Sequence, residues 1–74
     1  MLSKTPTQRE ISVLHLVAWG YANKEIASRL GLSVKTVEAH KAKGMWKLAL
    51  NGRPALVRYA VEAGWMTLAN APTS

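Results

Sequence analysis

Apolar residues recur along this chain at the three- and four-residue spacing of one helix face, in four separate segments. No segment alternates apolar and polar residues convincingly, so no strand is predicted. The first segment covers about residues 8–19. Thr7 followed by Glu10 fits a capping box at its start, and Gly20 is expected to end it. The pattern predicts an all-α domain.

The next two segments are predicted as helices over residues 23–30 and 34–49, joined by a tight turn at Gly31 and Leu32. Ser33 is the expected N-cap of the second of these, because its hydroxyl can accept a backbone N–H of the first turn. On a helical wheel, the residues of this helix expected to face the core are Val34, Val37, Met45 and Leu48. Two helices joined in this way are typical of a helix-turn-helix, which places its second helix in the major groove of DNA.

A fourth helix is predicted after a linker at residues 51–53, with Pro54 in its first turn and Gly64 at its end. Trp65 is expected to fold back on the last turn as the hydrophobic partner of a C-capping motif. The sequence predicts a tail at residues 1–6, a single domain at residues 7–66 and a flexible tail at residues 67–74.

The charge of the 74-residue chain is strongly positive, at +6, with ten Lys and Arg residues against four Glu residues. Eight of the ten cations lie between Lys24 and Arg58, where Glu25 and Glu38 are the only acidic residues. Polyanions are the partner class that suits this balance, although some clustering of lysines is simply a solvated helix face.

Several functional classes lack their sequence signals. The chain has no Cys and its two His residues have no neighbouring ligands, so no disulfide, metal or cofactor is expected. It has no carboxylate cluster or Gly-rich phosphate loop, so neither catalysis nor a small-molecule ligand is expected. No apolar run is long enough to cross a bilayer and no signal peptide is recognisable, so we expect a soluble, cytoplasmic protein with no membrane partner.

The chain also resembles a known family, the LuxR/FixJ/NarL-type DNA-binding domain of bacterial transcription regulators, from Thr7 to about Met66. The matching residues are Thr7, Arg9, Glu10, Val13, Leu14, Gly20, residues 23–27, Leu30, Ser33, Thr36, Val37, His40, Met45, Lys47, Leu48 and Arg53. The resemblance implies a four-helix helix-turn-helix domain, related to winged-helix folds but without a wing. It implies a third helix in the major groove, no catalysis, and a fourth helix that pairs two copies on paired half-sites.

The primary hypothesis is therefore sequence-specific binding of double-stranded DNA by the effector domain of a bacterial transcription regulator. Such a domain would act as a homodimer, by recruiting or obstructing RNA polymerase. Two alternatives are a DNA-targeting domain of a recombinase-type enzyme and a helical protein-interaction module. The apolar stripe expected at the dimer interface consists of Leu56, Tyr59, Ala60 and Ala63, although the same stripe would also serve to cover the core.

The residues predicted to contact DNA lie on the second and third helices. They are Asn23, Lys24, Ser33, Val34, Lys35, Thr36, Glu38, Ala39, His40, Ala42, Lys43 and Lys47. The lysines are interpreted as phosphate contacts that fix the register, with ordinary solvated lysines as the alternative. Asn23 and Lys24 would contact phosphate at a helix N-terminus, or serve only in capping and solvation. His40 is expected to face the DNA backbone, with simple packing as its alternative.

Three residues carry the expected sequence preference. Glu38 can accept a hydrogen bond from cytosine N4, or else form a salt bridge to a neighbouring lysine and merely tune affinity. Ala39 and Ala42 can offer only methyl contacts, for example to thymine, unless they are present simply for their helix propensity.

Three departures from the family pattern need a structural explanation. Ala22 stands where a Ser or Thr usually caps the second helix, so Asn23 is expected to take over the cap. Gly44 replaces a branched apolar residue at a cost of about 1 kcal/mol relative to Ala, which a bend or a closely packed neighbour would explain. Trp46 points away from the core on the helical wheel. It is expected to pack against the fourth helix or a tail, with an exposed partner surface as the alternative.

Overall fold

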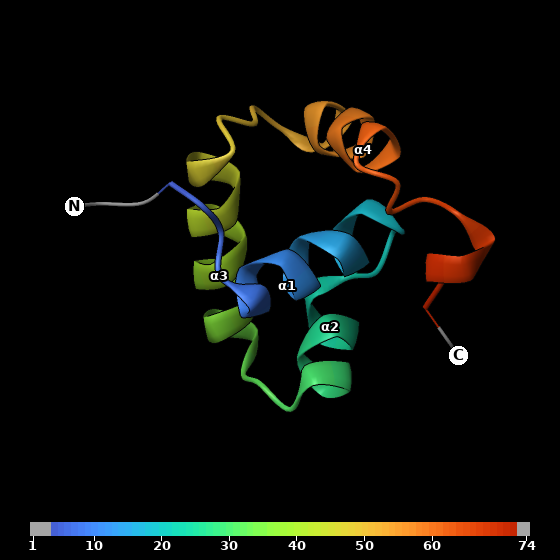
Figure 1. Cartoon of the computed structure of the whole chain (residues 1–74). Helices are drawn as coiled ribbons and strands as arrows, with labels where there is room; N and C mark the ends of the chain where they lie inside the picture. Colours follow the sequence, from blue (N-terminus) through green and yellow to red (C-terminus); the bar gives the residue numbers. More distant parts are fainter. Residues whose placement is uncertain (1–3, 73–74) are drawn as a thin grey trace.

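The computed structural model describes residues 4–72, which form four α-helices and a short 3-10 helix, with no strand among them. The elements are α1 (Gln8–Ala18), α2 (Asn23–Leu30), α3 (Val34–Lys47), α4 (Arg53–Glu62) and η1 (Leu68–Asn70). In Figure 1, α1 lies at the centre of the molecule, with α3 beside it, α2 below and α4 above. The predicted all-α, four-helix architecture is confirmed.

The hydrophobic core is built around α1. Its buried apolar residues are Val13, Leu14, Leu16, Val17 and Ala18, and the other helices add Ile26, Ala27, Val37, Leu56 and Ala60. α1 packs against each of the other three helices, and α2 also packs against α3. The two helices of the predicted helix-turn-helix are therefore held by the same central helix.

The prediction of which α3 residues face the core is partly wrong. Val37 is fully buried, and Met45 and Leu48 pack against the core from partly buried positions. Val34 was expected beside them but is 39% exposed. It is the first residue of α3, where the chain leaves the preceding turn at the edge of the core. A helical wheel gives the direction of a side chain but not where the neighbouring helices stop covering it.

Two helix starts use the capping residues that the sequence indicated, and two differ: α2 has another cap, and α4 begins at Arg53, which was predicted as the last residue of the linker. Thr7 and Glu10 form the capping box of α1, and Oγ of Ser33 accepts the Thr36 N–H at 3.1 Å at the start of α3. The N-cap of α2 is Ala22 and not Asn23, so that expectation is wrong. Alanine has no side-chain acceptor, and only the other half of a capping box forms, in which Oε1 of Glu25 accepts the Ala22 N–H at 2.9 Å.

All four helices end in the same Schellman-type arrangement. A residue with left-handed backbone follows the helix, and the next N–H bonds to a carbonyl five residues earlier. The donor–acceptor pairs are Tyr21–Leu16, Leu32–Ala27, Leu50–Met45 and Trp65–Ala60. Trp65 thus takes its predicted place, with its ring 5.4 Å from that of Tyr59.

Two helices are shorter than predicted. α1 ends at Ala18, one residue early, and α3 ends at Lys47, two residues early. The left-handed residue after α3 is Ala49, with φ 56°, where the other helices have glycine. No glycine marked this end in the sequence, which is why the prediction continued the helix to residue 49.

Part of the predicted C-terminal tail has a defined conformation. η1 follows α4, and Nδ2 of Asn70 donates to the Gly64 carbonyl at 2.7 Å. Of the two tails predicted from the sequence, residues 1–3 and 73–74 lie outside the described residues.

α1 and α3 approach each other closely at Gly44. A Cβ at this buried position would lie 2.8 Å from Cδ1 of Leu14 and 3.5 Å from Cβ of Glu10. The first distance is shorter than real Cβ contacts allow, and Leu14 is itself fully buried. Of the two explanations for a glycine here, the closely packed neighbour is therefore the one that the structure supports.

A buried ion pair joins the same two helices. Nζ of Lys47, in the last turn of α3, lies 2.9 Å from Oε1 of Glu10, in the first turn of α1. The Lys47 side chain is 18% exposed and that of Glu10 is 4% exposed. Lys47 and the backbone N–H of Thr7 hold the pKa of the Glu10 carboxyl below its ordinary value of 4.5, against the opposing effect of burial. One carboxylate thus completes a helix cap and links two helices.

The backbone at Ala49 predicts that glycine stabilises this position. A left-handed conformation costs an L-residue about 1–2 kcal/mol, and glycine avoids this cost. Part of the gain is lost because glycine increases the conformational entropy of the unfolded chain. Ala49→Gly should therefore raise the free energy of unfolding by about 0.5–1 kcal/mol. Urea denaturation measures this change in the free energy of unfolding. Ala42→Gly is the matched control in the exposed interior of α3 and should lower stability by about 1 kcal/mol. Equal losses in both variants would contradict the assignment.

The ion pair predicts a specific acid sensitivity. Because the pKa of Glu10 is lowered in the folded state, its stabilisation is complete above about 4.5 and is lost as the pH falls from there through the folded-state pKa. Glu10→Gln should lower stability at pH 7 and remove this component of the pH dependence. Urea denaturation between about pH 3 and 7, the range in which carboxyl groups titrate, measures both effects. Glu62→Gln, at an exposed carboxylate, should change neither.

Lys47→Met should lower stability at pH 7 by about 1–3 kcal/mol, since the Glu10 carboxylate loses its countercharge and keeps only hydrogen bonds such as that from the Thr7 N–H. A loss no greater than that of Glu62→Gln would show that the pair does not link the helices.

Candidate nucleic-acid interface

The face of α3 directed away from α1 is exposed along the whole helix. Its exposed residues at helical spacing are Lys35, Glu38, Ala39, Ala42, Lys43 and Trp46. Val37 and Gly44 lie on the opposite, buried side. Fourteen residues give α3 a length of about 21 Å. The sequence had placed five of these six residues together as candidate DNA contacts, and the structure brings them onto one surface.

The first turn of α3 adds polar groups to this surface. Ser33 is exposed and Thr36 is half-buried, and Oγ of Ser33 donates to Oγ1 of Thr36 at 2.9 Å. The hydroxyl of Ser33 also accepts the Thr36 N–H, so both residues serve in capping. Val34, which the core does not cover, lies in the same turn. His40 is half-buried one turn further along.

The cations of this region differ in how strongly they are already engaged. Lys24, Lys35 and Lys43 are exposed, and among residues 4–72 none of them has a carboxylate within ion-pair distance. Lys24 lies in the first turn of α2 beside half-buried Asn23. Lys47 was predicted as a DNA contact, but its ammonium is bound to Glu10. Nothing in the sequence around Lys47 separated it from the other lysines, because its partner is 37 residues away.

Arg29 is also engaged within the protein. Its guanidinium stacks over the ring of Tyr21 at 4.4 Å and donates to the Tyr21 hydroxyl at 3.1 Å. Arg29 keeps its charge, because the Tyr21 hydroxyl is neutral. Among the described cations of α2 and α3, Lys47 is the one paired with a carboxylate, and Lys24, Lys35 and Lys43 are the exposed lysines.

Glu38 lies exposed in the middle of the α3 face. Within the described residues it forms no ion pair, so the salt bridge to a neighbouring lysine that the sequence left open is not formed here. Its carboxylate is available to an external donor. Ala39, the next residue, and Ala42, one turn on, are exposed and small, so no bulky side chain stands beside the carboxylate there.

Trp46 was expected to pack against the fourth helix or a tail, with an exposed surface as the alternative, and the structure favours the exposed alternative. Its side chain is 70% exposed, and the contact that the structure gives it is with the N-terminal segment, where Nζ of Lys4 lies 5.9 Å from the ring centroid. The helical wheel had already placed Trp46 opposite the core. α3 ends one residue later, and no helix of the described chain covers the indole.

The apolar stripe on α4 faces the core more than it faces a partner. Leu56 and Ala60 are fully buried against α1, so they are removed from the predicted dimer interface. Tyr59 is half-buried and Ala63 is exposed. The exposed large apolar residue of α4 is Val61, at 60%. The alternative interpretation, in which the stripe covers the core, holds for Leu56 and Ala60.

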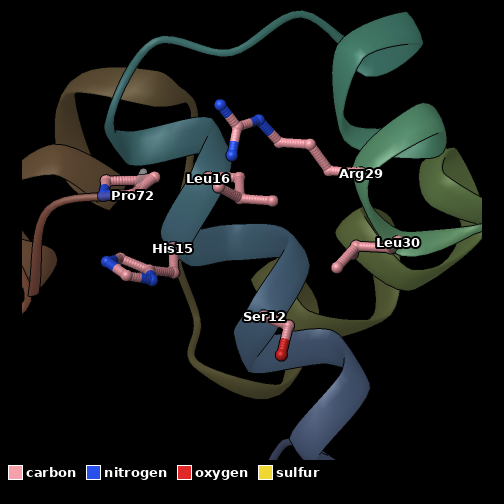
Figure 2. A pocket seen from close by; sticks show the side chains of 6 residues that line it. All are labelled: Ser12, His15, Leu16, Arg29, Leu30 and Pro72. Atoms are coloured by element: carbon pink, nitrogen blue, oxygen red, sulfur yellow. The ribbon is translucent and has the colours of Figure 1, made fainter. Parts of the chain in front are cut away.

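A separate pocket lies away from the α3 face, between α1, α2 and the C-terminal segment (Figure 2). It is lined by Ser12, His15, Leu16, Arg29, Leu30 and Pro72. His15 has the only imidazole there, and its Nε2 accepts a hydrogen bond from Nε1 of Trp19 at 3.0 Å. The arrangement offers no nucleophile with an adjacent base. Among residues 4–72 no three potential metal ligands cluster, and none of the helices there is long and apolar enough to span a membrane.

Comparison with known proteins agrees with this geometry. Residues 5–60 match the family described as bacterial regulatory proteins, luxR family. Relatives include the oxygen regulatory protein NreC of Staphylococcus aureus strains JH9, JH1 and MSSA476, each 54% identical over 59 residues. The alignments cover 80% of this chain but 27% of each relative, so the chain spans about a quarter of their length. The chain belongs to the luxR family of bacterial regulatory proteins and is a helix-turn-helix DNA-binding domain of a transcription regulator.

Proposed function

We propose that this domain binds double-stranded DNA in a sequence-specific manner, with α3 in the major groove. The observation that carries the proposal is the exposed α3 face, on which two unpaired lysines flank a carboxylate and two alanines. In this arrangement Lys35 and Lys43 neutralise phosphates, and the small side chains of the two alanines allow close approach to base edges. The contact residues are those predicted from the sequence, without Lys47 because Glu10 engages its ammonium.

The packing of α3 against α1 supports the same proposal. Its buried side is fixed against α1 by the close contact at Gly44 and by the Lys47–Glu10 ion pair. A recognition helix held on a rigid element positions its side chains more accurately than a loop does. The polar first turn, with Ser33 and Thr36, would face the DNA backbone at the entry of the groove.

We further propose that two copies bind paired half-sites through α4. α4 packs mainly on α1, which leaves the outer side of the helix, with Val61, uncovered. The contact would form on DNA, where the half-site spacing holds two copies together. In a longer regulator this domain would recruit or obstruct RNA polymerase. Selection of duplexes from a random pool, at a stated salt concentration, tests specificity and half-site symmetry together; recovery of random sequences would contradict the proposal.

The salt dependence of binding tests the lysine contacts. Each neutralised phosphate contributes about −0.9 to the slope of log affinity against log salt concentration. Lys43→Ala should weaken binding to all duplexes and reduce the slope by about one. Lys43→Arg, which keeps the charge, should leave the slope unchanged. Fluorescence anisotropy between about 50 and 200 mM salt measures both. A flat response in the unmodified protein would rule out phosphate binding.

Specificity tests the role of Glu38. If its carboxylate accepts from a cytosine amino group, Glu38→Ala should remove about 1–3 kcal/mol of discrimination at one base pair of the selected site. Affinities for single-base variants of that site measure the effect. Glu62→Gln, which removes an exposed carboxylate on α4, is the control and should leave the preference at that base pair in place. A uniform change in affinity across all variants would instead indicate that Glu38 only tunes the charge of the helix.

A further inference from the structure

Trp46 is the one exposed aromatic side chain among residues 4–72. The other aromatic residues of the chain, Trp19, Tyr21, Tyr59 and Trp65, are partly buried. At 70% exposure Trp46 contributes little to the core. Large aromatic side chains supply much of the binding energy where they meet a partner. The exposed indole at the end of the candidate DNA-binding face is therefore a candidate contact for a binding partner.

The position of Trp46 on α3 indicates which part of the DNA it meets, given the proposed function on which this inference rests. Trp46 shares the exposed face with Lys35, eleven residues earlier, which separates the two along the axis by about 16 Å. The major groove is about 12 Å wide, and helix-turn-helix recognition helices contact bases with their N-terminal residues. With Lys35 at the groove, the indole reaches beyond the base edges to the sugar–phosphate backbone.

The charges around Trp46 favour an anionic partner. Nζ of Lys4 lies 5.9 Å from the ring centroid, and Lys43 lies one turn earlier on the same face. The nearest carboxylate on that face, Glu38, is eight residues away, or about 12 Å along the axis. An indole between two lysines matches a deoxyribose with its flanking phosphates, because the ring covers the sugar, the lysines pair with phosphates and the indole N–H donates.

We propose that Trp46 packs against the sugar–phosphate backbone at the edge of the major groove, with Lys4 as an adjacent phosphate contact. The indole then contributes affinity that does not depend on salt, in contrast to the lysines of the same face. The N-terminal segment that carries Lys4 becomes part of the DNA-binding surface.

Trp46→Ala should weaken DNA binding about tenfold at every salt concentration, because apolar contact is lost but no charge is removed. The slope of log affinity against log salt should stay unchanged, whereas Lys4→Ala should reduce it by up to one. Trp46→Phe should recover part of the affinity. Leu68→Ala, at a residue that is 93% exposed away from α3, is the matched control and should bind like the unmodified protein. Thermal melting checks that each variant folds.

Quenching by acrylamide gives an independent readout. Bound DNA should protect the Trp46 emission, and the protection should disappear in Trp46→Phe, which retains Trp19 and Trp65. Full affinity of Trp46→Ala together with an unprotected indole would overturn the inference, while a normal effect of Lys43→Ala would leave the proposed function standing. An affinity loss seen only on paired half-sites, and not on a single half-site, would also overturn it by assigning Trp46 to a protein contact.

Discussion

The close contact between α1 and α3 is the constraint on which the rest of the structure depends. Gly44 allows it, since a Cβ at that position would lie 2.8 Å from Cδ1 of the fully buried Leu14. The Lys47–Glu10 ion pair joins the same two helices near the end of α3. Glu10 also caps α1, so the start of one helix and the end of the other are fixed by one carboxylate. Gly44 lowers the intrinsic stability of α3 by about 1 kcal/mol relative to Ala, and the close packing that it allows offsets this cost.

This contact determines what α3 can present to a partner. With its glycine side against α1, the opposite side carries only one large apolar residue, Trp46, beside two alanines and two lysines. Small residues thus lie on both sides of the helix for different reasons. Inside, Gly44 makes room for the side chain of Leu14, and outside, Ala39 and Ala42 leave room for another molecule. The stability of the fold and the accessibility of the candidate interface follow from the same placement of α3.

Local signals in the sequence predicted the helices well because their causes are local. The capping box at Thr7, the N-cap at Ser33 and the motif ending at Trp65 each depend on residues within one or two turns. Two local expectations were wrong, the cap at Asn23 and the end of α3, where Ala49 takes a left-handed backbone. The other errors arose where a partner lies far along the chain. Lys47 resembled the other lysines of its helix until Glu10 was placed beside it. The exposure of Val34 and the burial of Leu56 likewise depend on where neighbouring helices begin and end, which periodicity does not contain.

Counting cations consequently overstates the charge that this face can offer to DNA. Lys47 is paired with Glu10, whose carboxylate offsets its charge. The remaining exposed lysines of the two helices, Lys24, Lys35 and Lys43, supply few phosphate contacts per copy. A domain with so few contacts gains affinity in two ways: by pairing two copies on one duplex, and by adding contacts that do not depend on charge. The uncovered side of α4 serves the first, and the exposed indole of Trp46 serves the second.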